Sequence, residues 1–364
     1  MEENPKVDMM IDIGIITFLM DLLVYIGIYA ILSISLNIEY GYAGIPNFGK
    51  VLSFLGGAIV AGTVGSRLAL ILIDPNKDII SQNYEAVAII NNTFKNNIIF
   101  ALSILLVTIA ISIVIGIVLG FVASYPAIRL REDYLGMTLL AMAEVLKLIA
   151  YYYPNLVGGT LGMGLPDPLI AFGGGLFRSV SYALLIAVIM ILVYLYSRII
   201  LNSPLSRTLK AIRENENVAE AYGINIANAR IKTLVIASAI ASIAGVLYAF
   251  YTGDVHASTY DRYSWTFFVW LIVLLGGSGN ALGPLVGTTV FITIRKIMDY
   301  AKGQGLLTII PGIDPTWIQY IVLGLIFMSV LLFRPEGILK EKPSKTLPIA
   351  EIKNIQARLT KENK

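Results

Sequence analysis

Long apolar runs constrain the fold of this chain more than any other feature. The runs Ile11–Ile38, Ile98–Tyr125 and Ser179–Leu201 each exceed the roughly 18 residues that a helix needs to cross a bilayer. Backbone groups in lipid must be hydrogen-bonded within the segment, so such runs fold as helices. The composition agrees, since 57% of the residues are hydrophobic and only 14% are charged. The sequence predicts an all-α, polytopic membrane bundle of about 8–10 spans, with discontinuous or re-entrant segments.

The side-chain inventory excludes several classes of site. The chain contains no cysteine and a single histidine, His256, which excludes thiolate metal sites, disulfides and clusters of histidine ligands. The net charge of +3 is too small to indicate a nucleic-acid partner. The spacing from Gly44 to Lys50 resembles a nucleotide-binding loop, but Val51 stands where a Ser or Thr would bind magnesium. We therefore expect no enzyme activity, no cofactor and no metal in this chain.

Two glycine-rich stretches interrupt the apolar pattern. Gly41–Lys50 contains Pro46, and Gly276–Gly287 contains Pro284. Glycine and proline break helices, and a broken backbone at membrane depth persists only where protein or a watery path covers it. Each stretch is therefore either a tight turn between spans or a discontinuous helix beside a transport pathway.

Charged residues inside apolar runs are a second class of candidate. Asp21 lies in the first run, where it either sits near a membrane interface or faces protein or water. In the run Asp133–Tyr153, Glu144 and Lys147 lie three residues apart on one helix face, so Glu144 belongs either to a structural ion pair or to a pathway. Arg295–Thr316 is expected to be a loop.

One long polar segment, Ser203–Lys232, separates two apolar runs. Ser203 can cap a helix whose first residue is Pro204, a position where the missing N–H of proline is harmless. The apolar residues of this predicted helix fall on one face: Leu205, Leu209 and Ile212.

A second short helix is predicted within the same segment. Asn217 and Glu220 have the spacing of a capping box, which predicts a helix start at Asn217. Gly223 is placed to end this helix in the left-handed conformation. A short amphipathic element between two spans either docks onto a partner at the membrane surface or is a solvated loop.

Positively charged residues gather in this polar segment and in the C-terminal tail. Lys and Arg in short loops favour the cytoplasmic side, so we expect the loop 202–232 and the tail 334–364 to be cytoplasmic. Residues 1–333 are expected to form one transmembrane domain of about nine spans, with the N-terminus outside. Asn91 begins a glycosylation sequon, and the sequence leaves its use open.

Six stretches, in the same order, resemble the LivM-type permease subunits of ABC importers for branched-chain and other hydrophobic amino acids. The resemblance covers most of the chain, from about Ile31 to Leu339. The stretches are GYAGIPNFGK, LREDYLGMTLLAMAEVLKLI, VGGTLGMGLP, RTLKAIRENENVAEAYGIN, LLGGSGNALGPLVG and LFRPEGIL. The fourth of them resembles the cytoplasmic segment through which such a permease is coupled to its ATPase.

The resemblance implies import by alternating access, driven by ATP hydrolysis in separate subunits of the cytoplasmic membrane. It implies four partners besides membrane lipid: a second, related permease subunit, two cytoplasmic ATPase subunits and an extracytoplasmic substrate-binding protein. The implied coupling residues are Arg207, Arg213, Glu214, Glu216, Glu220, Ala221 and Gly223. The candidates for a translocation pathway are Gly44, Asn47, Tyr134, Thr138, Glu144, Gly276 and Gly277.

The stretch Gly41–Lys50 departs from the pattern of the family it resembles. Where the family has Gln-Leu-Ser-Leu-Gly-His, residues 45–50 of this chain are Ile-Pro-Asn-Phe-Gly-Lys. One alternative is therefore a permease for urea or short amides. A second, independent alternative is an ion-coupled secondary amino-acid transporter. The second alternative needs an ion-binding carboxylate in the membrane, for which Asp21 and Glu144 are the candidates.

Overall fold

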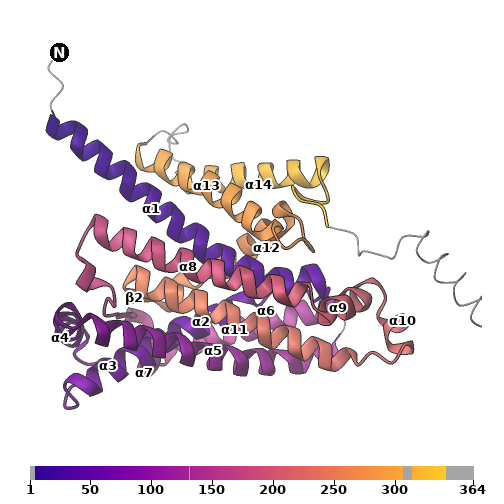
Figure 1. The fold of residues 1–364 in the computed structure, drawn as a ribbon, viewed down its shortest axis with the longest axis horizontal. Helices are drawn as coiled ribbons and strands as arrows, with labels where there is room; N and C mark the ends of the chain where they lie inside the picture. The colour runs from indigo at the N-terminus through magenta and orange to yellow at the C-terminus, as the bar shows by residue number, and fades with distance from the viewer. Residues whose placement is uncertain (1–4, 131, 306–313, 342–364) are drawn as a thin grey trace, which may run out of the picture.

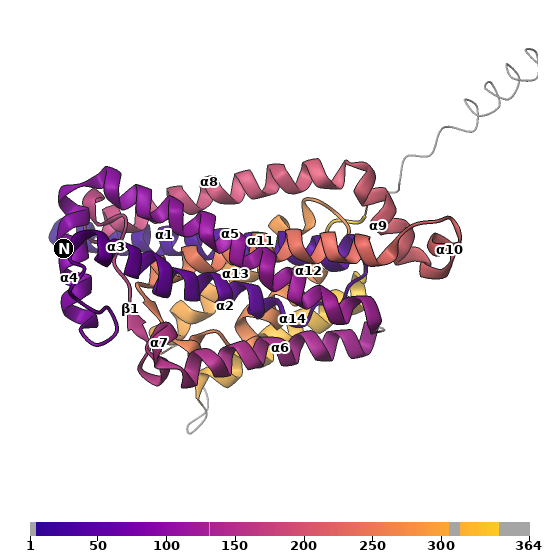
Figure 2. The ribbon, with the colours of Figure 1, turned by 90° about the horizontal axis from the view of Figure 1, so that it is seen from below.

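The computed structural model describes residues 5–130, 132–305 and 314–341. These residues form a bundle of long helices aligned with the long axis of the molecule (Figures 1 and 2). Within them, six helical segments are long and apolar enough to cross a membrane, and two shorter apolar helices are present. The six are Gly14–Tyr42, Lys50–Ile73, Ile98–Arg129, Tyr134–Tyr152, Leu176–Leu201 and Ile226–Thr252, and the shorter two are Tyr263–Gly276 and Pro315–Val330. The chain is an all-α, multi-pass membrane protein; the number of spans stays a prediction.

The long elements make up most of the described chain. They are α1 (Pro5–Leu36) with η1 (Asn37–Tyr42), α2 (Lys50–Val60) with η2 (Ala61–Gly65), α5 (Ile98–Arg129), α6 (Glu132–Tyr152), α8 (Leu176–Leu201), α11 (Ile226–Thr252), η6 (Tyr263–Phe267) with α12 (Phe268–Gly276), α13 (Gly283–Gly303) and α14 (Pro315–Phe333). Each glycine-rich stretch therefore contains a break between helices, at residues 43–49 and 277–282, while Pro284 lies in the first turn of α13.

The short elements gather at the two ends of the bundle (Figure 1). At one end, called here the α4 end, lie α3 (Ser66–Ile73), α4 (Asn83–Asn96), α7 (Pro154–Val157) and the turns η3 (Gly159–Leu161), η4 (Ile170–Phe172) and η5 (Ala257–Thr259). A two-stranded antiparallel sheet joins them, in which β1 (Met163–Gly164) pairs with β2 (Asp254–Val255). At the other end, called the α9 end, lie α9 (Pro204–Glu214) and α10 (Glu216–Ala221).

Helices α2 and α11 form the centre of the bundle. Gly57 of α2 lies against the Ser242 carbonyl and Gly245 of α11 against the Phe54 carbonyl, so closely that neither site has room for a Cβ atom. Gly116 and Gly120 of α5 also lie close to the backbone of α11. Small residues at four-residue spacing allow such backbone contact between membrane helices. The core is therefore set by close helix packing rather than by large side chains alone.

The prediction that Arg295–Thr316 is a loop was wrong for residues 295–303, which are helical because α13 continues to Gly303. Two residues on α1 bind the side chains of Arg295 and Lys296 and so offset the cost of placing these charges inside the bundle. Arg295 donates a hydrogen bond to the Tyr29 hydroxyl at 2.8 Å, and the Lys296 ammonium lies 2.6 Å from an Asp21 carboxylate oxygen. Residues 306–313 and the tail beyond Glu341 lie outside the described residues.

Candidate functional site at the α9 end

The helix α9 begins at Pro204, as the sequence predicts. Its apolar stripe is confirmed, since Leu209 and Ile212 are buried against the bundle. The cap was predicted wrongly: the Ser203 hydroxyl donates to the Ile200 carbonyl at 2.6 Å and makes no capping bond to α9. This hydroxyl is taken by the last turn of α8, so the first turn of α9 has no side-chain cap.

The helix α10 starts earlier than its predicted position. Asn215, rather than Asn217, is the cap, and its side-chain oxygen accepts a hydrogen bond from the Val218 N–H at 3.0 Å. Asn215 is extended at the break between α9 and α10, which is the backbone geometry that a capping residue needs. The end of the helix was predicted correctly, because Gly223 follows it with a φ of +79°.

The surface of α10 projects beyond the other helices at the α9 end (Figures 1 and 2). The predicted coupling residues Glu214, Glu216, Glu220 and Ala221 are all exposed there. Two large apolar side chains are exposed beside them: Val218 is 50% exposed and Tyr222 is 84% exposed. An exposed aromatic among charges is typical of a protein-binding surface rather than of a solvated loop.

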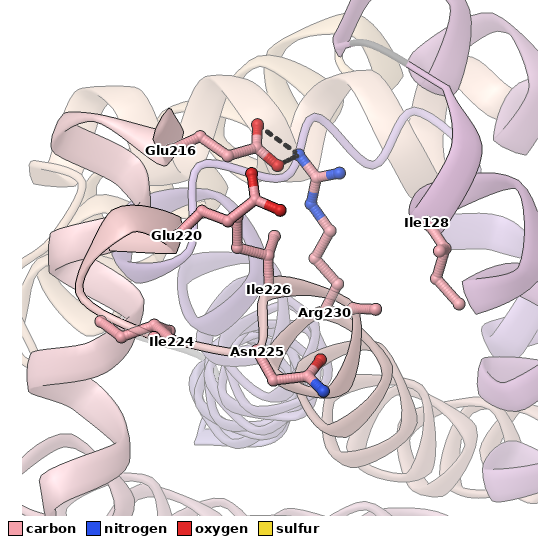
Figure 3. Close-up of a pocket in the computed structure, with 9 residues that line it drawn as sticks. Ile128, Glu216, Glu220, Ile224, Asn225, Ile226 and Arg230 are labelled. Atoms are coloured by element: carbon pink, nitrogen blue, oxygen red, sulfur yellow. Dashed lines mark hydrogen bonds and ion pairs between the residues drawn. The ribbon is translucent and has the colours of Figure 1, made fainter. Parts of the chain in front are cut away.

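A cavity of about 480 Å³, the α10 pocket, lies between α10 and the start of α11 (Figure 3). Its lining includes three predicted coupling residues, Glu216, Glu220 and Gly223, and one that the sequence interpretation did not select, Arg230. Among the described residues, the lining consists of Ile128, Glu216, Glu220, Gly223, Ile224, Asn225, Ile226, Ala227 and Arg230.

Arg230 is the positive charge of the α10 pocket. It donates to the Ala127 carbonyl at 2.9 Å, and its ion pair with Glu216 measures 3.1 Å. Figure 3 shows Glu220 beside this pair. The Arg230 Nε is buried and has no hydrogen-bond partner among the described residues. A buried donor without an acceptor is costly, so Arg230 is held in place against a local penalty by its bonds to Ala127 and Glu216.

Arg213 connects α9 to two other parts of the chain. It donates to the Gly41 carbonyl in the first glycine-rich stretch and to the Glu341 carboxylate, at 2.9 Å, in the C-terminal segment. Its side chain also lies against Gly44. Burial opposes the charge, but the hydrogen bonds to Glu341 and Glu214 raise the pKa of Arg213 above its usual value. Because Arg presents several donors in one rigid fork, one side chain can hold all these parts in register.

Asn37 lies in η1, just before the first glycine-rich stretch, and binds the second stretch. Its side-chain N–H donates to the Asn280 carbonyl at 2.9 Å, and its side-chain oxygen accepts from the Gly279 N–H at 3.0 Å. Asn280 in turn donates to the Lys340 carbonyl at 2.8 Å. We call the set Asn37–Lys50, Lys210, Arg213, Gly276–Gly283 and Ile338–Glu341 the α9 junction.

A buried ion pair closes the first glycine-rich stretch. The Lys50 ammonium lies 2.9 Å from a Glu39 carboxylate oxygen, and both side chains are 0% exposed. Neither Glu39 nor Asn37 was selected from the sequence, although both are polar residues at the end of an apolar run. Lys50, which departs from the family pattern, therefore acts as the counter-charge of Glu39.

The pathway residues predicted from the sequence fall into three places. Gly44 lies against Arg213, and Gly276 and Gly277 lie where a Cβ atom would meet the backbone of Gly283 and Leu339, so these three belong to the α9 junction. Asn47 also belongs to the α9 junction; it is buried, and its carbonyl accepts from the Trp270 indole at 2.9 Å. These contacts link the loop to α12.

The α6 residues lie on a neighbouring surface. Phe48 packs against Gly136, which brings the loop beside the turn of α6 that carries Tyr134 and Thr138. Tyr134 is exposed and Thr138 is partly exposed. Glu144, two turns further along α6, is not part of this contact.

The two carboxylates predicted as ion-binding candidates both have cationic partners. Asp21 pairs with Lys296 and accepts a hydrogen bond from the Tyr251 hydroxyl. Glu144 is 31% exposed and has two distant partners, Lys147 at 3.9 Å and Arg262 at 4.0 Å.

Replacing Glu144 with Gln is expected to lower the free energy of unfolding by less than about 1 kcal/mol, because long, partly exposed ion pairs contribute little. The check is the melting temperature of the purified protein in detergent. A loss comparable with that of a buried pair would show that Glu144 has a closer partner than Lys147 and Arg262.

Comparison with known proteins places these features in context. The family model described as "Branched-chain amino acid transport system / permease component" matches residues 18–331. A probable branched-chain amino acid transport permease protein LivM of Methanocaldococcus jannaschii is 40% identical over 328 residues, which cover 90% of this chain and 95% of that protein. The high-affinity LivM permease protein of Salmonella typhimurium is 24% identical over 258 residues, 64% of this chain and 57% of that protein. No solved structure matches the chain.

Proposed function

The chain belongs to the family of permease components of branched-chain amino-acid transport systems, and we propose that it is the membrane subunit of an ATP-driven importer of such amino acids. The observation that carries the proposal is the connection of an exposed helix, α10, through α9 and Arg213 to both glycine-rich breaks. A loop that only joined two spans would not need these contacts.

The proposed docking site for an ATPase is the surface of α10 together with the α10 pocket. Tyr222 and Val218 supply apolar contact area, and Glu214 and Glu220 supply charge. Arg230 lies in the wall of this pocket, where its guanidinium group already pairs with Glu216. The α9 end is then cytoplasmic, which agrees with the positive charges of the loop 202–232. Arg207, the seventh predicted coupling residue, lines a separate cavity toward α8.

Transport follows from the rigidity of the α9 junction. Closure of two ATPase subunits would displace α10 and α9 together, and Arg213 would carry this displacement to Gly41 and Gly44. Asn37 would pass it to Gly279 and Asn280 at the inner end of α12 and α13. The spans attached to both breaks would thereby alternate between outward and inward openings. A related second permease and an extracytoplasmic binding protein would complete the importer.

Branched-chain amino acids are favoured over urea or short amides as the substrate. The departure of residues 45–50 from the family pattern has a structural cause, since Lys50 neutralises Glu39 and Phe48 packs on Trp270. The departure therefore gives no reason to assign a different substrate. The names of the relatives, which are branched-chain amino-acid transport permeases, also favour branched-chain amino acids.

Reconstitution in liposomes tests the proposal. The expected result is uptake of leucine, isoleucine or valine that needs ATP, the ATPases, the second permease and the binding protein together. Uptake by this chain alone, driven by a proton or sodium gradient, would instead establish the ion-coupled carrier. The pairing of Asp21 with Lys296 and of Glu144 with Lys147 and Arg262 argues against that carrier.

Two substitutions in α10 are expected to abolish uptake while the chain remains inserted in the membrane. Glu220→Lys reverses a charge on the docking surface. Gly223→Pro removes the N–H that donates to the Glu220 carbonyl at 2.8 Å and forbids the positive φ. The checks are ATP-driven uptake and the amount of chain in purified membranes.

A matched control separates backbone strain from a change of surface. A Cβ atom at Gly223 has open space around it, so Gly223→Ala is expected to cost only about 1 kcal/mol of strain and to retain most uptake. Normal uptake by both Glu220→Lys and Gly223→Pro would contradict the assignment of α10 as the docking helix.

A further inference from the structure

A second cavity at the α9 end is lined by basic side chains. It has a volume of about 520 Å³ and lies between the last turns of α8, the first turns of α9 and the loop that precedes α13. Arg198, Arg207 and Lys210 line it, and among the described residues its lining contains no Asp or Glu. We call it the basic cavity.

The positive charge of the basic cavity is only partly neutralised. Lys210 lies 2.6 Å from the Glu341 carboxylate, which also binds Arg213. Arg198 and Arg207 are exposed and form no ion pair within residues 5–130, 132–305 and 314–341. The cavity therefore presents two free guanidinium groups to an anion.

The start of α9 adds further donors to the same cavity. The Ser203 hydroxyl donates to Ile200, so the amides of the first turn of α9 lack a side-chain cap. Ser203, Ser206 and Arg207, which belong to this turn or precede it, line the cavity. Free amides at a helix start together with cations make a site for a phosphate group.

The surroundings of the basic cavity distinguish a lipid phosphate from a free anion. Tyr194 and Arg198, in the last two turns of the membrane-spanning α8, form one wall. On the same turns Leu195 and Ile199 are exposed, Ile199 to 70%. An anionic headgroup in the cavity would thus leave its acyl chains against an apolar helix face, at the depth where Tyr and Arg favour the membrane interface.

We propose that the basic cavity binds the phosphate of an anionic phospholipid from the leaflet at the α9 end. The lipid would bind Arg198 on a span and Arg207 on α9 at once. It would thereby fix the start of α9 relative to the membrane, on the side of that helix opposite the α10 pocket. The binding does not depend on the proposed transport function.

Lipid binding to the full chain, purified with any associated subunits, tests this proposal. Native mass spectrometry would compare three probes: short-chain phosphatidylglycerol, phosphatidylcholine of the same chain length, and inorganic phosphate. We expect tight binding of phosphatidylglycerol only. Loss of a cation costs about fivefold in affinity, so Arg198→Gln with Arg207→Gln is expected to weaken binding by roughly 25-fold.

Arg129→Gln is the matched control. Arg129 lies in the last turn of another span, α5, stacks on Tyr125 and does not line the basic cavity. It is expected to bind phosphatidylglycerol as the unaltered chain does. Both cavity arginines are exposed, so the double variant should keep its melting temperature in detergent.

Three results would overturn the proposal. In the first, the double variant would bind phosphatidylglycerol normally. In the second, inorganic phosphate would bind as tightly as phosphatidylglycerol, which would identify a site for a free anion. In the third, the double variant would keep its lipid and lose its ATPase, which would assign the two arginines to the protein partner.

Discussion

Replacing Lys50 with Met is expected to destabilise the chain by about 3–5 kcal/mol, the largest loss of stability among the substitutions considered. The reason is that Glu39 would remain as a carboxylate with 0% exposure and no cation to pair with. Removing both charges should cost far less, because burying an ion pair requires its desolvation. The double variant Glu39→Leu with Lys50→Met is therefore expected to regain most of the lost stability.

Melting temperatures of the purified variants in detergent check this prediction. Lys147→Met is the matched control, since it removes a lysine whose partner Glu144 lies 3.9 Å away and is partly exposed. The Lys147→Met variant should lose less than about 1 kcal/mol of unfolding free energy. Equal losses for Lys50→Met and Lys147→Met would contradict the structural role of the buried pair. A double variant that is as unstable as the single Lys50→Met variant would also contradict this role.

Arg213→Lys is expected to reduce ATP-driven uptake at least tenfold while the complex with the ATPase remains assembled. A lysine keeps the charge but cannot bind the Gly41 carbonyl and the Glu341 carboxylate in one fork. Each hydrogen bond from a charged group contributes about 1.5–3 kcal/mol, and about 1.4 kcal/mol is a factor of ten. The docking surface around Tyr222 is untouched, so assembly should not change.

Uptake and co-purification of the ATPase, measured on the same preparations, check the Arg213 prediction. Lys210→Ala is the control: Lys210 also binds Glu341, but it does not contact either glycine-rich stretch through a hydrogen bond. Its effect on uptake should be smaller than that of Arg213→Lys. Normal uptake by Arg213→Lys would show that the displacement of α9 reaches the breaks by another route.

The membrane class and the helices α9 and α10 could be predicted because local patterns determine them. Apolar runs specify spans, and Pro204 and Gly223 fix one end of each short helix. The exact caps could not be predicted. Ser203 and Asn217 both fit the local pattern, but the hydroxyl of Ser203 binds the preceding helix, and the chain becomes extended at Asn215 instead.

The α9 junction could not be predicted, because its contacts join residues that are far apart in the sequence. Arg213 binds Gly41 and Glu341, and Asn37 binds Gly279 and Asn280. Arg213 and Gly44 were both selected from the sequence, but for different roles. The helical part of Arg295–Thr316 could not be predicted for the same reason. Its charged residues Arg295 and Lys296 indicate a loop, but in the structure they bind Tyr29 and Asp21, which lie far away in the sequence.

Site-specific photo-crosslinking at Tyr222 tests the central claim most directly. A crosslinking amino acid would replace Tyr222, which directly follows α10 and is 84% exposed, or Tyr84, which is 91% exposed on α4 at the opposite end. In native membranes, the probe at position 222 is predicted to capture an ATPase subunit and the probe at position 84 is not. Capture of an ATPase from position 84, or from neither position, would contradict the account of α10 as the helix through which ATP drives this permease.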